Sequence, residues 1–308
     1  MVVFKWIRNA AFLAISISLP LSAQAYNPLS SISDYNALIF GNAQAAGGGT
    51  EGRMAVGGDL LAKWYGVGTS LTPDASSYSL IVGEDLNAEG AWQVYNGNTA
   101  YGGELISSPS TSSSYTISNN SDVLDFESLL TGMQSTSDNL TSLTSSGTFV
   151  YDGYSTVTLT GTSDTLNVFN LTDEQATVWS NVSSHVISAP AGSTVIVNVG
   201  GETCTLSYGM TLNGIDCTHV LFNYYDASSL TINSMSLQGS LLAPDAALTL
   251  NYGGINGITV AGSSTQNSSS FRSYAFDGDV PMVPEPSTLA VCLTGLGLAI
   301  PLIRRRLC

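Results

Sequence analysis

A five-residue pattern occurs twice in the chain, and it constrains the fold more than any other feature of the sequence. Val56-Gly57-Gly58-Asp59-Leu60 returns 26 positions later as Val82-Gly83-Glu84-Asp85-Leu86. Each copy follows a short apolar stretch and precedes a Gly-rich or polar segment, as expected if one coil of a β-solenoid has been repeated. A pair of hairpins with similar turns is the alternative, because Gly-Gly-Asp and Gly-Glu-Asp are ordinary turn sequences.

Short runs of alternating apolar residues recur further along the chain. Leu230 with Ile232 and Leu248 with Leu250 are examples, and Asn, Gly, Pro and Asp separate the runs. This pattern is typical of stacked short strands whose apolar side chains point inward at alternate positions. The clearest individual strands are predicted at Thr156 to Thr160 and at Thr194 to Val199. We therefore predict a mainly β, β-solenoid or β-helix-like single domain.

One segment departs from the β pattern. From Val123 to Leu143 the apolar residues fall at spacings of three, four and seven, which place one stripe on an α-helix. Asp122 is a suitable N-cap, and Gly147 supplies a stop. Because only one side is apolar, we expect a helix over about residues 122–144 that packs lengthwise on the β-solenoid.

Both ends of the chain have the layout of sorting segments. Lys5 and Arg8 precede an uncharged apolar run from Ala10 to Leu21, and Ala23-Gln24-Ala25 has the form that signal peptidase cleaves. The run is shorter than the roughly 20 residues of a membrane-spanning helix, which argues against a retained anchor. We expect residues 1–25 to be a signal peptide and the mature chain to begin at Tyr26.

The C-terminal segment, residues 284–308, starts with a Pro-Glu-Pro tripeptide. An uncharged stretch over 287–303 follows, predicted to be a transmembrane helix, and three arginines after it should stay in the cytoplasm. An ordinary C-terminal anchor is the alternative. The tail resembles that of PEP-CTERM proteins, which implies recognition by an exosortase in a Gram-negative bacterium that makes extracellular polysaccharide. The residues that carry this resemblance are Pro284, Glu285, Pro286, Arg304, Arg305 and Arg306.

Residues 26–283 also resemble a known surface domain. Tyr35 to Ala43 followed by Thr50 to Leu60 is similar to the opening of the choice-of-anchor A domain, and Gly239 to Ala246 is similar to its closing part. The resemblance implies an adhesin or matrix protein, with collagen-binding relatives. The arrangement of strands and one long helix also looks like the ice-binding β-solenoid fold, which we take as an analogy of fold alone. The family motif consists of Glu51, Gly52, Arg53, Gly57 and Gly58.

The charge of the mature chain excludes one class of partner. Residues 26–283 contain three basic and 22 acidic residues, a net charge of −19. Such a surface repels phosphate backbones and anionic lipids, so nucleic-acid binding is excluded. It could attract divalent cations or keep a secreted protein soluble. The 258 residues suffice for one large domain or two small ones.

No residue pattern predicts an enzyme. His185 and His219 are the only histidines, and they lack a metal-ligand spacing. Asp59 and Asp85 would stack in a solenoid, where they could act as an acid pair or bind Ca²⁺. A turn Asp that bonds its own backbone explains both positions without any activity, and we favour this interpretation. We expect no cofactor, with Ca²⁺ as the alternative. Arg53 is expected to pair with Glu51 or Asp59.

Cys204 and Cys217 are the two cysteines of the mature domain. Export would place them in an oxidising compartment, so we predict a disulfide worth roughly 3 kcal/mol, with two buried thiols as the alternative.

The function expected from these features is adhesion outside the inner membrane. The ligands that fit this chemistry best are an extracellular polysaccharide or another surface protein, and signal peptidase and exosortase would be the processing partners. Exposed aromatic rings suit sugar and protein recognition, and the candidates are Trp64, Trp92, Tyr95, Tyr101, Tyr151, Tyr154, Tyr224 and Tyr225. The alternatives are a carbohydrate-active β-helix enzyme and a calcium-dependent matrix module. An ice-binding array would need repeated Thr-x-Thr strands, and Thr156 to Thr160 is a single candidate.

Overall fold

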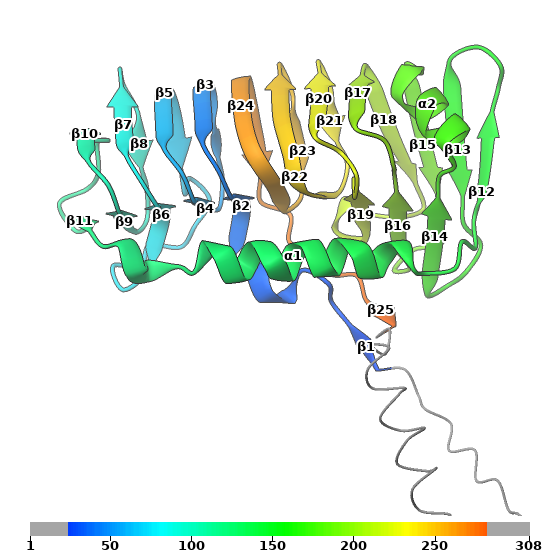
Figure 1. The fold of residues 1–308 in the computed structure, drawn as a ribbon, viewed down its shortest axis with the longest axis horizontal. Coiled ribbons are helices and arrows are strands. Elements are labelled where there is room, and N and C mark those ends of the chain that lie inside the picture. Colours follow the sequence, from blue (N-terminus) through cyan, green and yellow to red (C-terminus); the bar gives the residue numbers. More distant parts are fainter. Residues whose placement is uncertain (1–23, 282–308) are drawn as a thin grey trace, which may run out of the picture.

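The computed structural model describes residues 24–281, which form one elongated β-solenoid with a helix along its length (Figure 1). Nineteen strands form one continuous sheet in which neighbouring strands pair in parallel. The predicted mainly β solenoid is therefore the observed architecture. The predictions for Ala23, for the membrane helix at 287–303 and for the sorting residues Pro284, Glu285, Pro286, Arg304, Arg305 and Arg306 lie outside the described residues. Within 24–281 no helix is long and apolar enough to cross a membrane.

The sheet winds around three sides of the solenoid. The first side lies under the long helix and includes the first parts of β22 (Ser240–Asn251) and β24 (Thr259–Arg272). Its other strands are β2 (Tyr35–Ile39), β4 (Arg53–Val56), β6 (Tyr78–Val82), β9 (Asn98–Tyr101), β11 (Ile117–Asn119), β14 (Leu166–Asn170), β16 (Thr194–Asn198) and β19 (Val220–Asn223).

The second and third sides complete each coil. The last part of β22 and the middle of β24 lie on the second side. The other strands of this side are β3 (Ala43–Thr50), β5 (Leu60–Val67), β7 (Leu86–Glu89), β10 (Leu105–Ser107), β17 (Thr203–Ser207) and β20 (Ser229–Asn233). The ends of β3, β5 and β24 turn onto the third side with β8 (Gln93–Val94), β21 (Ser236–Leu237) and β23 (Gly254–Asn256).

The chain enters the solenoid at its middle. The first strands build coils toward β11 at one end, and α1 (Phe126–Thr141) then runs back along the first side to the other end (Figure 1). A second sheet stands there, made of β12 (Thr148–Tyr151), β13 (Thr156–Thr160), β15 (Ser184–Ser188) and β18 (Gly209–Asn213). The remaining coils return to the middle, where β24 pairs with both β2 and β3.

Strands of the first side are apolar on both faces. Leu38, Ala55 and Ile81 occupy one register and belong to the cluster beneath α1, whereas neighbours such as Ile39 and Val56 point into the core. Burial on both faces explains why these strands read as continuous apolar runs rather than as alternating ones.

The long helix is shorter than predicted. Asp122 belongs to a separate 3₁₀ turn, η2 (Ser121–Val123), and Leu124 is extended. Asp125 is the N-cap of α1, and its Oδ1 accepts a hydrogen bond from Ser128 N at 3.0 Å. The predicted apolar stripe is confirmed, because Met133, Leu140 and Leu143 are buried against the first side.

Two buried asparagines, Asn198 and Asn223, and the partly buried Asn170 attach α1 to the solenoid. Asn198 Nδ2 donates to Leu140 O at 2.8 Å and to Asn170 Oδ1 at 2.7 Å. Asn223 Nδ2 donates to Ser137 O at 2.9 Å and to Asn198 Oδ1 at 2.8 Å. The side chains stack on β14, β16 and β19 and supply donors to carbonyl groups of the helix, so each polar group buried at this junction is paired.

A second helix, α2 (Asp173–Asn181), was not predicted. Thr172 accepts from Gln175 N while the Gln175 side chain accepts from Thr172 N, which is a capping box. The tetrad Thr-Asp-Glu-Gln that starts this helix is the sequence signal that could have found it. Trp179 of α2 is fully buried against the core.

The two ends of the described chain lie together. The strands β1 (Ala25–Tyr26) and β25 (Val280–Pro281) pair antiparallel on the same side as α1 (Figure 1). The pair lies below β19 and β16 in Figure 1, and Asp279 N donates to Thr194 Oγ1 of β16 at 2.9 Å.

Candidate functional site

A column of threonines lies on the outer surface of the second side. Thr205, Thr231, Thr249 and Thr265 stand in register on the neighbouring strands β17, β20, β22 and β24. The residues before and after each threonine point inward and are buried. Successive hydroxyl groups are thus repeated at the spacing of parallel strands, about 4.8 Å.

A second column, two residues further along each strand, is mainly asparagine. Asn251 Nδ2 donates to Asn233 Oδ1 at 2.8 Å, and Asn267 Nδ2 donates to Asn251 Oδ1 at 2.8 Å. Ser207 completes the column on β17. The hydrogen bonds hold each amide in one orientation, so the column presents a fixed row of polar groups.

These columns form a surface without charge, which we call the threonine face. Its members are the outward residues of β17, β20, β22 and β24, namely Thr203, Thr205, Ser207, Ser229, Thr231, Asn233, Ala247, Thr249, Asn251, Ser263, Thr265 and Asn267. A neutral surface of this extent contrasts with the strongly acidic composition of the mature chain.

The character of the second side changes beyond β24. On β3 the corresponding residues are Gln44 and Ala46, and on β5 they are Leu61 and Lys63. Lys63 Nζ forms an ion pair with Glu89 Oε2 of β7. The threonine face is therefore confined to the strands that follow α1 in the chain.

A sharp corner borders the threonine face. The residue after the asparagine column has a positive φ on every coil, including Tyr208 (76°), Ser234 (52°) and Tyr252 (55°). Tyr208 and Tyr252 are 71% and 69% exposed. A left-handed backbone is unusual for a bulky residue and marks a position where the surrounding structure imposes the conformation. The corner thus holds two aromatic rings out beside the asparagines.

Asp59 and Asp85 stack on successive coils, as the repeat predicted, but they bond to the backbone. Asp59 Oδ1 accepts from Asp85 N at 3.1 Å, and Asp85 Oδ1 accepts from Glu104 N at 2.7 Å. In the preceding coil Asn42 Oδ1 has the same role, accepting from Asp59 N at 2.9 Å. The column is a chain of caps between coils, and no group of three His, Cys, Asp or Glu residues that could hold a metal occurs within 24–281.

The family motif residues are structural. Glu51 Oε2 accepts from Ser273 N at 2.9 Å, and Gly52 N donates to Asn36 Oδ1 at 3.1 Å. A Cβ at Gly57 would lie 2.2 Å from Phe40 O, and one at Gly58 would lie 2.1 Å from Asn42 Oδ1. Only glycine allows the coils to approach this closely.

The partner predicted for Arg53 was wrong. Its Nη1 lies 3.9 Å from Asp34 Oδ1, and its Nη2 donates to Ser77 Oγ at 3.2 Å. Glu51 bonds backbone at Ser273 and Asp59 caps the next coil, so neither carboxylate is directed at the guanidinium.

The predicted disulfide is absent, since Cys204 and Cys217 are both free thiols. Cys204 points inward from β17 and contacts Ser180 Oγ at 2.9 Å, whereas Cys217 begins the 3₁₀ turn η3 (Cys217–His219). Burial raises the pKa of both thiols, so the thiolate needed for oxidation is disfavoured at each.

The histidines do not form a reactive pair. His185 is fully buried, and its Nε2 lies 2.8 Å from Trp179 O. His219 Nδ1 lies 3.0 Å from Thr218 Oγ1 at the end of η3. Both positions agree with satisfied structural histidines.

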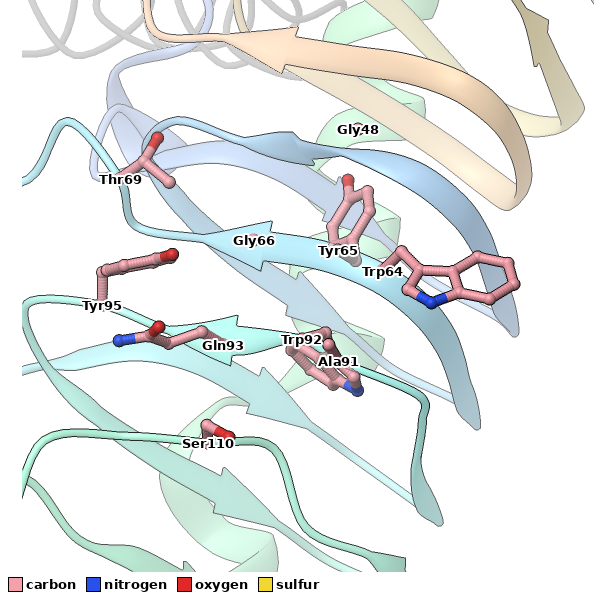
Figure 2. A pocket seen from close by; sticks show the side chains of 10 residues that line it. All are labelled: Gly48, Trp64, Tyr65, Gly66, Thr69, Ala91, Trp92, Gln93, Tyr95 and Ser110. Carbon is pink, nitrogen blue, oxygen red and sulfur yellow. The ribbon is translucent and has the colours of Figure 1, made fainter.

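The candidate aromatic residues separate into three groups. Tyr224 is 1% exposed in the core, and Tyr101 and Tyr225 are partly buried. Tyr151 and Tyr154 are exposed at the turn between β12 and β13. The remaining three, Trp64, Trp92 and Tyr95, line one cleft (Figure 2).

Sequence reasoning missed the threonine face. Thr156 to Thr160, the single Thr-x-Thr candidate, forms β13, where Thr158 stands beside Val186 of β15, so its pattern is not repeated. A partial signal for the face is the triplet Thr-x-Asn, which occurs in it at Thr231-Ile232-Asn233, Thr249-Leu250-Asn251 and Thr265-Gln266-Asn267. The same triplet occurs outside the face at Thr165-Leu166-Asn167 and Thr211-Leu212-Asn213, so it does not locate the face by itself.

Comparison with known proteins gives a family. Two solved structures are similar to the chain. One is an ice-binding protein from the Antarctic ascomycete Antarctomyces psychrotrophicus, with 14% identity, a TM-score of 0.42, and coverage of 79% of this chain and 96% of that chain. The other is an ice-binding protein from an Antarctic biological consortium, with 13% identity, a TM-score of 0.38, and coverage of 82% of this chain and 95% of that chain. No curated protein sequence matches. The model of the family described as "Putative Ice-binding-like adhesive domain" matches residues 28–272. The match agrees with the expected class of adhesive surface protein, while the choice-of-anchor A and PEP-CTERM resemblances stay predictions. The chain belongs to this ice-binding-like adhesive family.

Proposed function

We propose that the protein is a non-catalytic adhesin that is exported to the cell surface or extracellular matrix and binds exopolysaccharide through the threonine face. The observation that carries the proposal is the register of Thr205, Thr231, Thr249 and Thr265 on four neighbouring strands. The face is regular, uncharged and rich in hydroxyl and amide groups.

The ligand class follows from this chemistry. A polysaccharide presents repeated hydroxyl groups, and a row of threonines and asparagines at a constant spacing can hydrogen-bond several of them together. The hydrogen bonds from Asn251 to Asn233 and from Asn267 to Asn251 fix the amides before binding, which lowers the entropy lost on association. Tyr208 and Tyr252 add amphipathic rings at the border.

The position of the chain ends supports processing at both of them. Ala25 pairs with Pro281, so the predicted signal peptidase site and the start of the PEP-CTERM segment lie next to one short ladder. Cleavage by signal peptidase or by an exosortase would affect only the two-residue strands β1 and β25. We propose that the C-terminal segment holds the chain at the inner membrane of a Gram-negative bacterium before release.

The test uses the fragment Tyr26–Val283 on a column of immobilised exopolysaccharide from the host. Replacing Thr231 and Thr249 by Leu removes two hydroxyl groups and makes the face uneven, and each lost hydrogen bond is worth about 1 kcal/mol, so we expect binding to weaken about tenfold or more. Thr211→Leu on β18 is the control, because Thr211 is an exposed strand threonine that lies outside the face. Equal retention of all three proteins would contradict the proposal.

The same experiment examines the two rival functions. A carbohydrate-active enzyme would shorten the polymer during incubation, and a calcium-dependent module would lose binding in the presence of a chelator. We expect an intact polymer and unchanged retention, because Asp59 and Asp85 are engaged with backbone N–H groups.

Ice is the second candidate ligand, and the same threonine column favours it. Hydroxyl and methyl groups repeated at one spacing can match a crystal surface as well as a polymer, and the family description names ice-binding-like domains. Ice would be supported as the ligand if the fragment inhibited ice recrystallisation and the Thr231→Leu/Thr249→Leu variant did not. Retention on the polymer without any effect on ice would assign the face to polysaccharide.

A further inference from the structure

A cleft of about 440 Å³ lies on the third side of the solenoid, apart from the threonine face (Figure 2). It spans the coils of β5 and β8. Trp64 stands at one end and Tyr95 at the other, with the backbone of β5 and Gln93 of β8 between them. A volume of this size falls in the range of small-molecule sites.

The cleft exists because glycines form its floor. A Cβ at Gly66 would lie 3.4 Å from both Thr69 Cγ2 and Tyr95 Cε2, so any longer side chain there would enter the space between the walls. The indole of Trp64 covers Gly90 of the next coil, where a Cβ would lie 3.2 Å from Trp64 Nε1. Open backbone on β5 thus leaves room between the aromatic rings.

Trp64 is held out from the solenoid by its backbone. Its φ of 49° places it in the left-handed region, at the same corner as Tyr208 and Tyr252. Trp64 is 66% exposed. Exposure of so large an apolar side chain beside a cleft favours a role in binding.

The polar groups of the cleft are neutral. Gln93 offers an amide, and Thr69 and Ser110 offer hydroxyl groups. None of the residues that line it is charged, and the nearby Lys63 is paired with Glu89. A phosphate or carboxylate ligand would find no cation here, whereas a neutral molecule with an apolar face and polar edges would find both kinds of partner.

We propose that this cleft binds one or two residues of a neutral sugar, with Trp64 and Tyr95 against the faces of the pyranose rings and Gln93, Thr69 and Ser110 at their hydroxyl groups. The site is separate from the threonine face and does not depend on it. The protein then combines a surface for an ordered polymer with a pocket for individual sugar residues.

The test is titration of Tyr26–Val283 with soluble tetrasaccharides of glucose, mannose and galactose, followed by tryptophan fluorescence and calorimetry. Trp92 and Trp179 are buried, so Trp64 is the exposed tryptophan among residues 24–281. We expect one of the sugars to shift the emission to shorter wavelength. Trp64→Ala should weaken binding of that sugar about tenfold, and Gly66→Leu, which fills the cleft, should abolish it.

Tyr154→Ala is the matched control, because Tyr154 is 89% exposed and lies in neither site. It should bind the sugar as the unmodified fragment does. No binding by any of the three tetrasaccharides, equal weakening in Tyr154→Ala, or tighter binding of an acidic tetragalacturonate would overturn the proposal. Trp64→Ala should be retained on the polymer column like the unmodified fragment, and Thr231→Leu/Thr249→Leu should still bind the tetrasaccharide. Failure of the cleft proposal can therefore be distinguished from failure of the proposed function of the threonine face.

Discussion

His185 shows how a single polar residue is accommodated inside the solenoid. It is fully buried, with Nε2 2.8 Å from Trp179 O and Nδ1 3.3 Å from Gly209 O. Its ring packs edge-on against Trp179 with centroids 4.4 Å apart. Burial lowers the pKa of His185 below its ordinary value of 6.5, although the two carbonyl groups partly oppose this shift.

This shift predicts a loss of stability in mild acid. Below pH 6.5 His185 becomes protonated in the unfolded chain, whereas in the folded chain it stays neutral until the pH reaches its lower pKa. The free energy of unfolding therefore falls as the pH drops from 6.5 toward the pKa of His185 in the folded chain. Thermal unfolding of the fragment between pH 7 and pH 5 measures it. His185→Gln should remove most of this slope. A slope that survives in His185→Gln would show that other groups cause it.

The cysteines give a second residue-scale prediction. Because Cys204 and Cys217 are free, both should react with an alkylating reagent after unfolding in the absence of reductant, and mass spectrometry should count two labels. In the folded fragment Cys204 should react much more slowly than Cys217, since it is 3% exposed. Detection of no labels before reduction would restore the disulfide that the sequence predicted.

At the scale of elements, the attachment of α1 depends on buried amides as well as on its apolar stripe. Asn198→Leu would leave Asn170 Oδ1 without its donor and Asn223 Nδ2 without one of its two acceptors, and Leu140 O would keep only its backbone donor, Leu143 N. We expect a cost of about 2 to 4 kcal/mol. Denaturant unfolding measures the change. Asn213→Leu on β18 is an exposed control and should stay within about 0.5 kcal/mol. A loss of similar size in both variants would mean that the ladder does not hold the helix.

How well each element can be predicted depends on how local its cause is. The stripe from Met133 to Leu143 and the alternation in Thr156 to Thr160 are local patterns, and both elements are present. The sequence favours Asp122 over Asp125 as N-cap because nothing in it shows that Leu124 is extended. The threonine column escapes prediction because its members are 16 to 26 residues apart and become neighbours only through the register of the coils.

At the scale of the whole molecule, the path of the chain is not predictable from the repeat. The copies at Asp59 and Asp85 indicate stacking, but they do not reveal that α1 carries the chain to the far end or that β24 closes against β2 and β3. The pairing of β24 with β2 and β3 joins residues more than 200 positions apart in the sequence. It connects the strands that precede α1 with those that follow it into one solenoid.

A circular permutant tests this closure. Because Ala25 pairs with Pro281, the two ends can be joined by a short linker, and a new opening at Gly153 cuts an exposed turn. We expect the permutant to unfold in a single thermal transition, as the unmodified fragment should. An opening between β2 and β3 at Asn42, which accepts from Asp59 N, should be much less stable. Two separate transitions in the first permutant would show that the halves fold independently.

The central claim is that the threonine face is the surface that meets the ligand. Hydroxyl-radical footprinting of the fragment bound to exopolysaccharide tests this directly, because oxidation of each exposed tyrosine is read separately. We predict that Tyr208 and Tyr252 at the border of the face are protected by the polymer, while Tyr154, which is 89% exposed at the end of the solenoid, is oxidised as in the free protein. Protection of Tyr154 with continued oxidation of Tyr208 and Tyr252 would contradict the claim.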